Sequence, residues 1–213
     1  MLDKQAEPGR EKLGFKEAVL SSFKFLAEFR FHMVEEKVTF VRYESSEVFI
    51  NIYHGRASYE MNIEIGRLKE PNKHLTIGTI VPWAGAEKTE GFGQHVMFQV
   101  SSRENVQEFV PKLAGLVRKY AIPLLRGGDD AFGSAFEFQA KMWAEYVREV
   151  NLSNVRGKAE AAWQAKDYAS VVELYTSIQN DLTEIEAKRL GYSERQIVST
   201  QGTQFGTGAD KKH

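Results

Sequence analysis

Apolar side chains recur at helical spacing near the amino terminus and then at strand spacing. Between residues 14 and 28 they fall three or four positions apart, which predicts an amphipathic helix. Three segments rich in Val, Ile, Phe and Tyr follow, with short polar connectors between them, so the pattern predicts an antiparallel meander. These three predicted strands span residues 37–43, 47–54 and 57–68.

The third predicted strand has the clearest alternation of the chain. Its apolar positions are Tyr59, Met61, Ile63 and Ile65, and polar residues stand between them, so one face of the sheet is expected to be dry and one wet. The helix over residues 14–28 is expected to cover the dry face, because an isolated meander buries too little apolar surface to be stable. Residues 75–81 and 96–100 are candidates for a fourth and a fifth strand, with a Gly-rich loop between them.

The helical period takes over after residue 100. The residues from Ser101 to Glu104 have the form of a capping box for a helix that Pro111 is expected to kink or split. The Gly-Gly-Asp-Asp sequence at 127–130 ends one element and caps the next, and a capping box at Thr183 starts a last helix that ends near Val198. The longest predicted helix follows residue 130, with a stripe of Phe132, Phe136, Gln139, Trp143, Tyr146, Val147 and Val150.

The predicted fold class is therefore α+β. An N-terminal helix packs on an antiparallel β-meander of 3 to 5 strands, and a C-terminal helical half follows. We expect an α+β domain over residues 13–150, then a helical hairpin with a terminal helix packed on it over residues 151–198. Residues 1–12 and 199–213 are expected to be disordered, because neither segment can bury enough apolar surface to offset its ordering entropy.

One segment of the helical half resembles a known repeat. The sequence from Ala162 to Tyr175 places Trp163 near the end of one helix, a tight Asp-Tyr turn after it, and Tyr175 at the centre of a second helix. In this it is similar to a tetratricopeptide (TPR) hairpin, over about residues 159–182, although Lys166 stands where that family usually has its turn glycine. Only one copy is present, so the resemblance implies a TPR-like hairpin packed on the main domain and not a repeat array.

The order helix, meander, helices also resembles small uncharacterised bacterial proteins, including immunity proteins that neutralise partner toxins. This resemblance rests on the layout of the elements and on no diagnostic motif. It implies a binding function with a protein partner such as a toxin, and no catalytic residues.

Composition narrows the function classes. The 28 basic and 29 acidic residues give a net charge of -1, which makes nucleic acid an unlikely partner. The chain has no cysteine, so disulfides, thiolate nucleophiles and cysteine-type zinc sites are excluded. No signal-like segment and no apolar run long enough for a membrane helix is legible, so we expect a cytoplasmic protein without a membrane partner.

No sequence motif for catalysis, phosphate binding or metal binding is legible. The chain has no Walker sequence, no Gly-x-Ser-x-Gly elbow and no dinucleotide fingerprint, and its histidines never occur at i, i+4 spacing. His54, Glu60 and Glu64 could converge on a metal across the hairpin, but a solvated strand face explains them without an ion. We predict no metal site and no cofactor.

A cluster of cationic and aromatic residues around the predicted hairpin is the strongest candidate site. Planar guanidinium and aromatic groups are typical of protein hot spots and stacking platforms, although tyrosines are also good strand formers and arginines keep an exposed face soluble. Trp83, beside Pro82, is either a second contact residue or a plug for the end of the core. The candidate binding residues are Arg42, Tyr43, Tyr53, His54, Arg56 and Trp83.

The sequence favours a non-catalytic protein-binding protein over an enzyme. An immunity or adaptor protein fits this interpretation, with another protein or a second copy of the chain as its partner. The alternative is a small-molecule or nucleotide-binding protein, or an enzyme, with a pocket between sheet and helices near Trp83, His95 and Arg42.

Overall fold

The computed structural model describes residues 9–55, 59–86 and 98–204, and these fall into two compact units. The units divide between Lys141 and Met142, inside helix α6 (Asp129–Gln164), whereas the sequence placed a boundary at residue 150. The expected class is confirmed: an N-terminal helix, an antiparallel sheet and a helical second half make an α+β protein.

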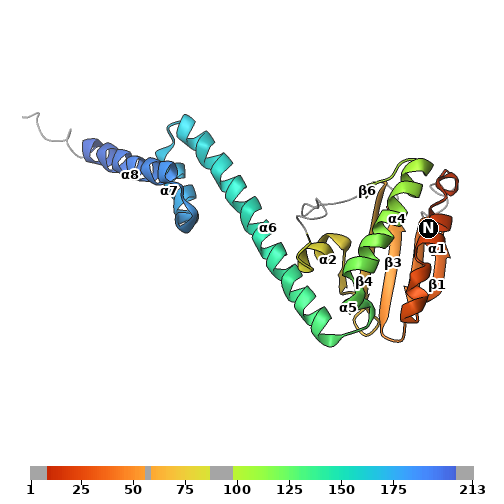
Figure 1. The fold of residues 1–213 in the computed structure, drawn as a ribbon. Helices are drawn as coiled ribbons and strands as arrows, with labels where there is room; N and C mark the ends of the chain where they lie inside the picture. Colours follow the sequence, from red (N-terminus) through yellow and green to blue (C-terminus); the bar gives the residue numbers. More distant parts are fainter. Residues whose placement is uncertain (1–8, 56–58, 87–97, 205–213) are drawn as a thin grey trace, which may run out of the picture. The chain divides into compact units, whose positions relative to one another are not determined.

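The sheet of the first unit is antiparallel throughout, with the order β1-β2-β3-β4-β5 (Figure 1). Strand β6 also pairs with β4, at Glu60 and Met61, while β5 pairs near the other end of β4, at Ile65 and Gly66. The two short strands therefore share one edge of β4. The strands are β1 (His32–Lys37), β2 (Phe40–Glu44), β3 (Val48–His54), β4 (Glu60–Arg67), β5 (His74–Leu75) and β6 (Phe98–Gln99).

The register of the central strands produces the two faces that the alternation predicts. Val41, Ile52 and Ile63 stand opposite one another and are fully buried, so they belong to the core face. One position along, Arg42, Asn51 and Glu64 are paired in the same way and point to the other face, because successive side chains of a strand alternate. We call this second face the open face of the sheet.

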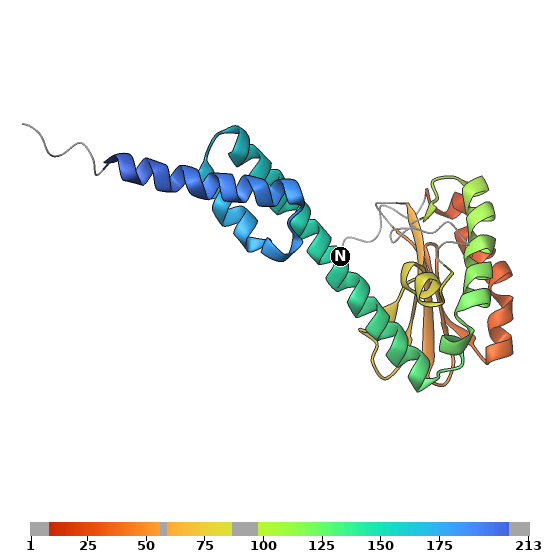
Figure 2. The same cartoon turned by 60° about the vertical axis from the view of Figure 1, so that its left-hand side comes forward.

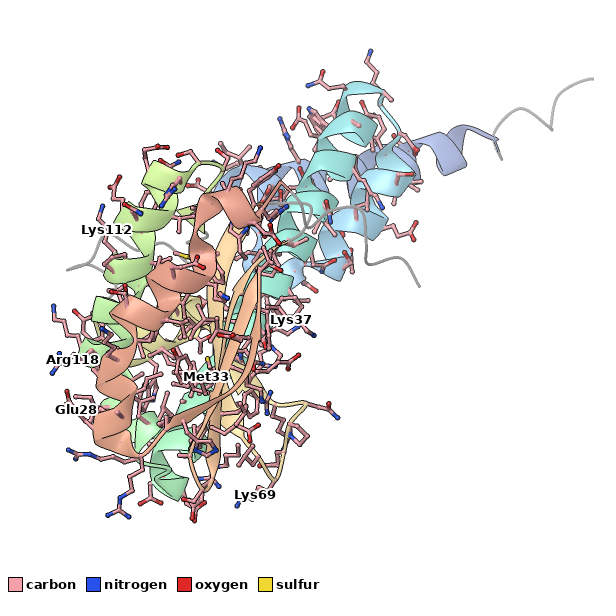
Figure 3. The ribbon with its side chains drawn as sticks, turned by 90° about the vertical axis from the view of Figure 1, so that its right-hand side faces the viewer. Glu28, Met33, Lys37, Lys69, Lys112 and Arg118 are labelled. Carbon is pink, nitrogen blue, oxygen red and sulfur yellow. The ribbon has the colours of Figure 1, made fainter. Side chains whose placement is uncertain are left out.

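Helices cover the core face of the sheet. The predicted N-terminal helix appears as α1 (Phe15–Ser22) and a 3-10 segment, η2 (Lys24–Phe29), and α1 lies beside α4 (Arg103–Tyr120) in Figures 1 and 2. An exposed ion pair joins η2 to α4 at the surface, where Arg118 Nη2 lies 3.2 Å from Glu28 Oε1 (Figure 3). The buried stripe of α4 is Val106, Val110, Leu113, Ala114, Leu116 and Val117.

Two predictions for the first unit are wrong. Of the segment predicted as a fourth strand, 75–81, only Leu75 belongs to a strand, β5. Helix α2 (Ile77–Trp83) takes up most of the rest, because Ile77, Ile80 and Val81 are buried together at helical spacing. Strand β1 was not predicted as a separate strand. Its residues are almost all exposed, so it lacks the alternation that reveals a half-buried strand.

Three local details also differ from expectation. Ser102, and not Ser101, caps α4: its Oγ accepts a bond from the Asn105 amide at 3.2 Å. Of the kink or split expected at Pro111, the split does not occur, since α4 is one helix from Arg103 to Tyr120, and short helix α5 (Ile122–Leu125) follows it. Residues 9–12 are not disordered, since Glu11–Leu13 form the 3-10 segment η1 and Arg10 is buried.

Strand β1 forms the outer edge of the sheet. Its pairing with β2 is interrupted by a bulge between Met33 and Glu35, and Met33 is 42 % exposed. Lys37 Nζ lies 2.7 Å from Glu35 Oε1. Figure 3 labels Lys37, the last residue of the strand, and Met33, the second. The edge of the sheet is thus short, bulged and charged.

The second unit contains the carboxyl-terminal part of α6, then α7 (Tyr168–Ser177), η3 (Gln179–Asp181) and α8 (Glu184–Gln204). Asp167 caps α7 by accepting a bond from the Ser170 amide at 3.2 Å. The predicted capping box of α8 is confirmed: the Thr183 amide donates to Glu186 Oε2 at 2.7 Å, and the Glu186 amide donates to Thr183 Oγ1 at 3.3 Å. The buried centre of the unit consists of Ala159, Val171, Tyr175 and Ile178.

Candidate functional site

The predicted cluster of cationic and aromatic residues is divided between the two faces of the sheet. Arg42 and Tyr53 lie on the open face, whereas their sequence neighbours Tyr43 and His54 lie on the core face. The reason is that successive side chains of a strand point to opposite faces. The pKa of Tyr53 is raised by burial and by the nearby carboxylates of Glu64 and Glu60. Burial, with a smaller effect of Glu36, also raises the pKa of Tyr43. Arg56 lies outside the described residues.

The open face carries a ladder of polar contacts across the strands. Arg42 bonds Glu44 Oε1 through Nε at 2.6 Å and Asn51 Oδ1 through Nη1 at 3.0 Å. The Asn51 amide nitrogen then donates to Glu64 Oε2 at 2.9 Å. The Arg42 guanidinium also lies 4.4 Å from the centre of the Phe49 ring. These contacts engage Arg42 within the sheet, which favours a structural role for it.

His54 is clamped between two distant segments on the core side. Its Nε2 lies 2.6 Å from the Val100 carbonyl oxygen and its Nδ1 lies 2.7 Å from Arg10 Nη1. A carbonyl only accepts and a guanidinium only donates, so Nε2 carries the proton and the ring is neutral. Burial is the main cause of its lowered pKa, with Arg10 adding to it and the Val100 bond opposing it.

The register of β3 and β4 is incompatible with the metal arrangement considered from the sequence. Glu60 and Glu64 have the opposite strand parity to His54, so the three side chains do not converge. Arg10 lies 4.3 Å above the ring of Tyr59 and completes the clamp. Among the described residues, no group of three or more His, Asp or Glu side chains is arranged to hold a metal ion.

Trp83 is half-buried at the end of α2. Its indole Nε1 donates to Ser134 Oγ at 3.3 Å, and the side chain packs against the main core. Four surface hollows of the described residues are lined by other residues, and neither Trp83 nor Arg42 borders any of them. His95 lies outside the described residues.

Three aromatic rings pack together where α6, α7 and α8 meet. The ring centres of Trp163, Tyr168 and Tyr192 lie 5.5 to 6.1 Å apart, in edge-to-face geometry. Arg189 covers the Trp163 ring at 5.2 Å, and a hollow of about 480 Å³ opens beside the cluster. The rings contact one another directly, so this cluster holds the turn of the hairpin against α8.

The most exposed apolar residues of the second unit's part of α6 form a row. Trp143 is 65 % exposed, Val147 49 % and Val150 41 %. With Asn154 they follow a spacing of four, three and four, which places them on one side of the helix. The centre of the Trp143 ring lies 5.6 Å from the centre of the Tyr146 ring, which is one helical turn further along α6.

Between residues 143 and 154, the side of α6 that carries this row has no charged residue. At 100° per residue, Ala144, Tyr146 and Asn151 flank the row, while Glu145, Arg148 and Glu149 fall on the opposite side. We call this surface the uncharged face of α6. Its members are Trp143, Ala144, Tyr146, Val147, Val150, Asn151 and Asn154.

The sequence pattern predicted that Trp143, Val147 and Val150 share one side of a helix, but it did not predict that they are exposed. The helical stripe that included Trp143, Val147 and Val150 is typical of a helix packed on a core. Its first member, Phe132, is indeed 2 % exposed in the first unit, but the later members are not covered by the unit to which they belong. The fold and this face define an α+β protein with a helical unit that presents a bare apolar row.

Comparisons with known proteins add no relative: no protein-family model, no curated protein and no solved structure matches the chain. Within the described part of the chain, no helix combines the length and the apolar character that a membrane crossing requires.

Proposed function

We propose that the chain is a non-catalytic protein-binding protein and that it contacts its partner through the uncharged face of α6. The single observation that carries the proposal is the exposure of Trp143 at 65 %, in one row with Val147 and Val150. Tryptophan is enriched among residues that dominate binding energy, and contiguous exposed apolar surface is typical of interaction sites.

The chemistry of the face supports a helix or another apolar surface as the partner. It offers apolar contact from the row and hydrogen bonds from the amides of Asn151 and Asn154, but no charge. Because no charge surrounds Trp143 on this face, a partner can pack closely against it without desolvating a charged group. An immunity or adaptor role and the TPR-like nature of the hairpin stay predictions.

Site-specific photo-crosslinking in cells of the source organism tests this proposal. A benzophenone amino acid in place of Ala144 stands on the uncharged face beside Trp143, and the same group in place of Glu145 stands on the opposite side. We expect a discrete protein adduct from position 144 and none from position 145.

Two further results decide the matter. Adding Trp143→Ala to the position 144 variant is expected to weaken the adduct strongly, because the aromatic anchor is lost. Equal adducts from both positions, or no adduct from either, would refute binding through this face.

A further inference from the structure

We infer that the uncharged face of α6 pairs with the same face of a second copy of the chain, in antiparallel orientation. This inference rests on the proposed function and names the partner. The row Trp143, Val147, Val150 and Asn154 has the alternating spacing of four and three residues that forms the seam of two packed helices. An antiparallel pair related by a two-fold axis is self-complementary, as a closed dimer requires.

One register uses every residue of the row. If Val147 faces Val150 of the second copy, the two-fold axis repeats this contact, and two apolar layers form the centre of the seam. In the same register Trp143 faces Asn154 of the second copy at each end. The indole N–H can then donate to the amide oxygen of that asparagine, so the polar side chain at the seam has a partner.

The positions beside the seam also fit a second copy. In this register Ala144 approaches Asn151 of the other helix, and Tyr146 approaches its Ser153, so no two like charges meet. The charged residues Glu145, Arg148 and Glu149 remain on the solvent side of both helices. A face without charge brings no like charges together when it pairs with itself.

The face is small for a stable interface, so a dimer formed through it must be weak and reversible. An aromatic side chain offers about 150–250 Å², so Trp143 at 65 % exposure contributes roughly 100–160 Å² per copy. The two valines add less than this, and a stable interface usually buries about 800 Å² per partner. We therefore expect association that depends on concentration, seen as a rise in weight-average mass on sedimentation.

Disulfide trapping tests the register directly, because the natural chain has no cysteine. Two full-length variants of different mass, Val147→Cys and Val150→Cys, are mixed and oxidised. In the proposed register the mixed 147–150 disulfide forms at least fivefold faster than either symmetric disulfide. Glu145→Cys mixed with Glu149→Cys, on the opposite side, is the matched control and should give only background cross-linking.

Each outcome supports or overturns the inference. Faster symmetric disulfides would mean a parallel pair, and yields equal to the control would mean no pairing through this face; either result overturns the proposal. Trp143→Ala in both variants should slow the mixed disulfide about tenfold. If the chain is monomeric at every concentration and position 144 still captures another protein, self-pairing fails while the proposed function stands.

Discussion

Replacing Gly66 by alanine tests how closely the loop before β5 packs on the open face of the sheet. A Cβ at this position would lie 2.5 Å from the Lys73 carbonyl oxygen and 2.5 Å from Cζ of the Phe49 ring. Neither neighbour can retreat easily, because the oxygen belongs to the backbone and Phe49 is 1 % exposed beneath Arg42. Overpacking of this kind costs about 1–3 kcal/mol, and we expect the upper half of that range for Gly66→Ala.

Urea unfolding followed by Trp83 fluorescence measures this effect for the first unit, once Trp143 and Trp163 are replaced by phenylalanine. With a slope of about 2 kcal/mol/M, the midpoint should fall by roughly 1 M. Gly115→Ala is the matched control: Gly115 lies in α4, and a Cβ there meets nothing within 4 Å. That variant should gain about 0.5–1 kcal/mol. A Gly66→Ala protein as stable as the wild type would refute the close approach.

Three further predictions concern the clamp and the helical unit. The pKa of His54 is lowered in the folded state, so the stability that neutral His54 contributes is complete above about pH 6.5 and is lost as the pH falls below it. Between about pH 7.5 and 5, the free energy of unfolding in urea should fall more steeply for wild type than for His54→Gln. Equal pH dependence of the two proteins would contradict the neutral clamp. Thr183→Ala removes one half of the capping box and should cost the second unit about 1 kcal/mol by thermal unfolding, whereas the exposed Ser153→Ala should not. Tyr175→Ala removes the largest side chain from the centre of the second unit and should lower its free energy of unfolding by about 3–5 kcal/mol. Amide hydrogen exchange should then accelerate in α7 and α8 while β3 stays protected. Uniform acceleration would argue against separate units.

Periodicity in the sequence predicted β4 and α4, because each has one buried face. Strand β3 is buried on both faces and was predicted from its run of Val, Ile, Phe and Tyr, whereas α7 was predicted from the TPR resemblance and α8 from its capping box. Periodicity failed where burial is unusual. Strand β1 is exposed on both sides, and α2 is rich in β-branched residues, whose burial against the core overrides their strand propensity.

The candidate site was harder to predict than the fold. Adjacent residues such as Arg42 and Tyr43 are neighbours in sequence but point to opposite faces, so proximity along a strand is not proximity in space. Arg10 and His54 are 44 positions apart and meet only in the folded unit. The exposure of Trp143 depends on what other elements leave uncovered, which no local pattern records.

The bulged edge strand bears on how the chain behaves at high concentration. A flat, apolar edge can add strands from other molecules and grow into cross-β aggregates. In β1 the bulge between Met33 and Glu35 interrupts the ladder, and Glu35, Glu36 and Lys37 place charge along it. Concentrated solutions should therefore form no thioflavin-positive fibres.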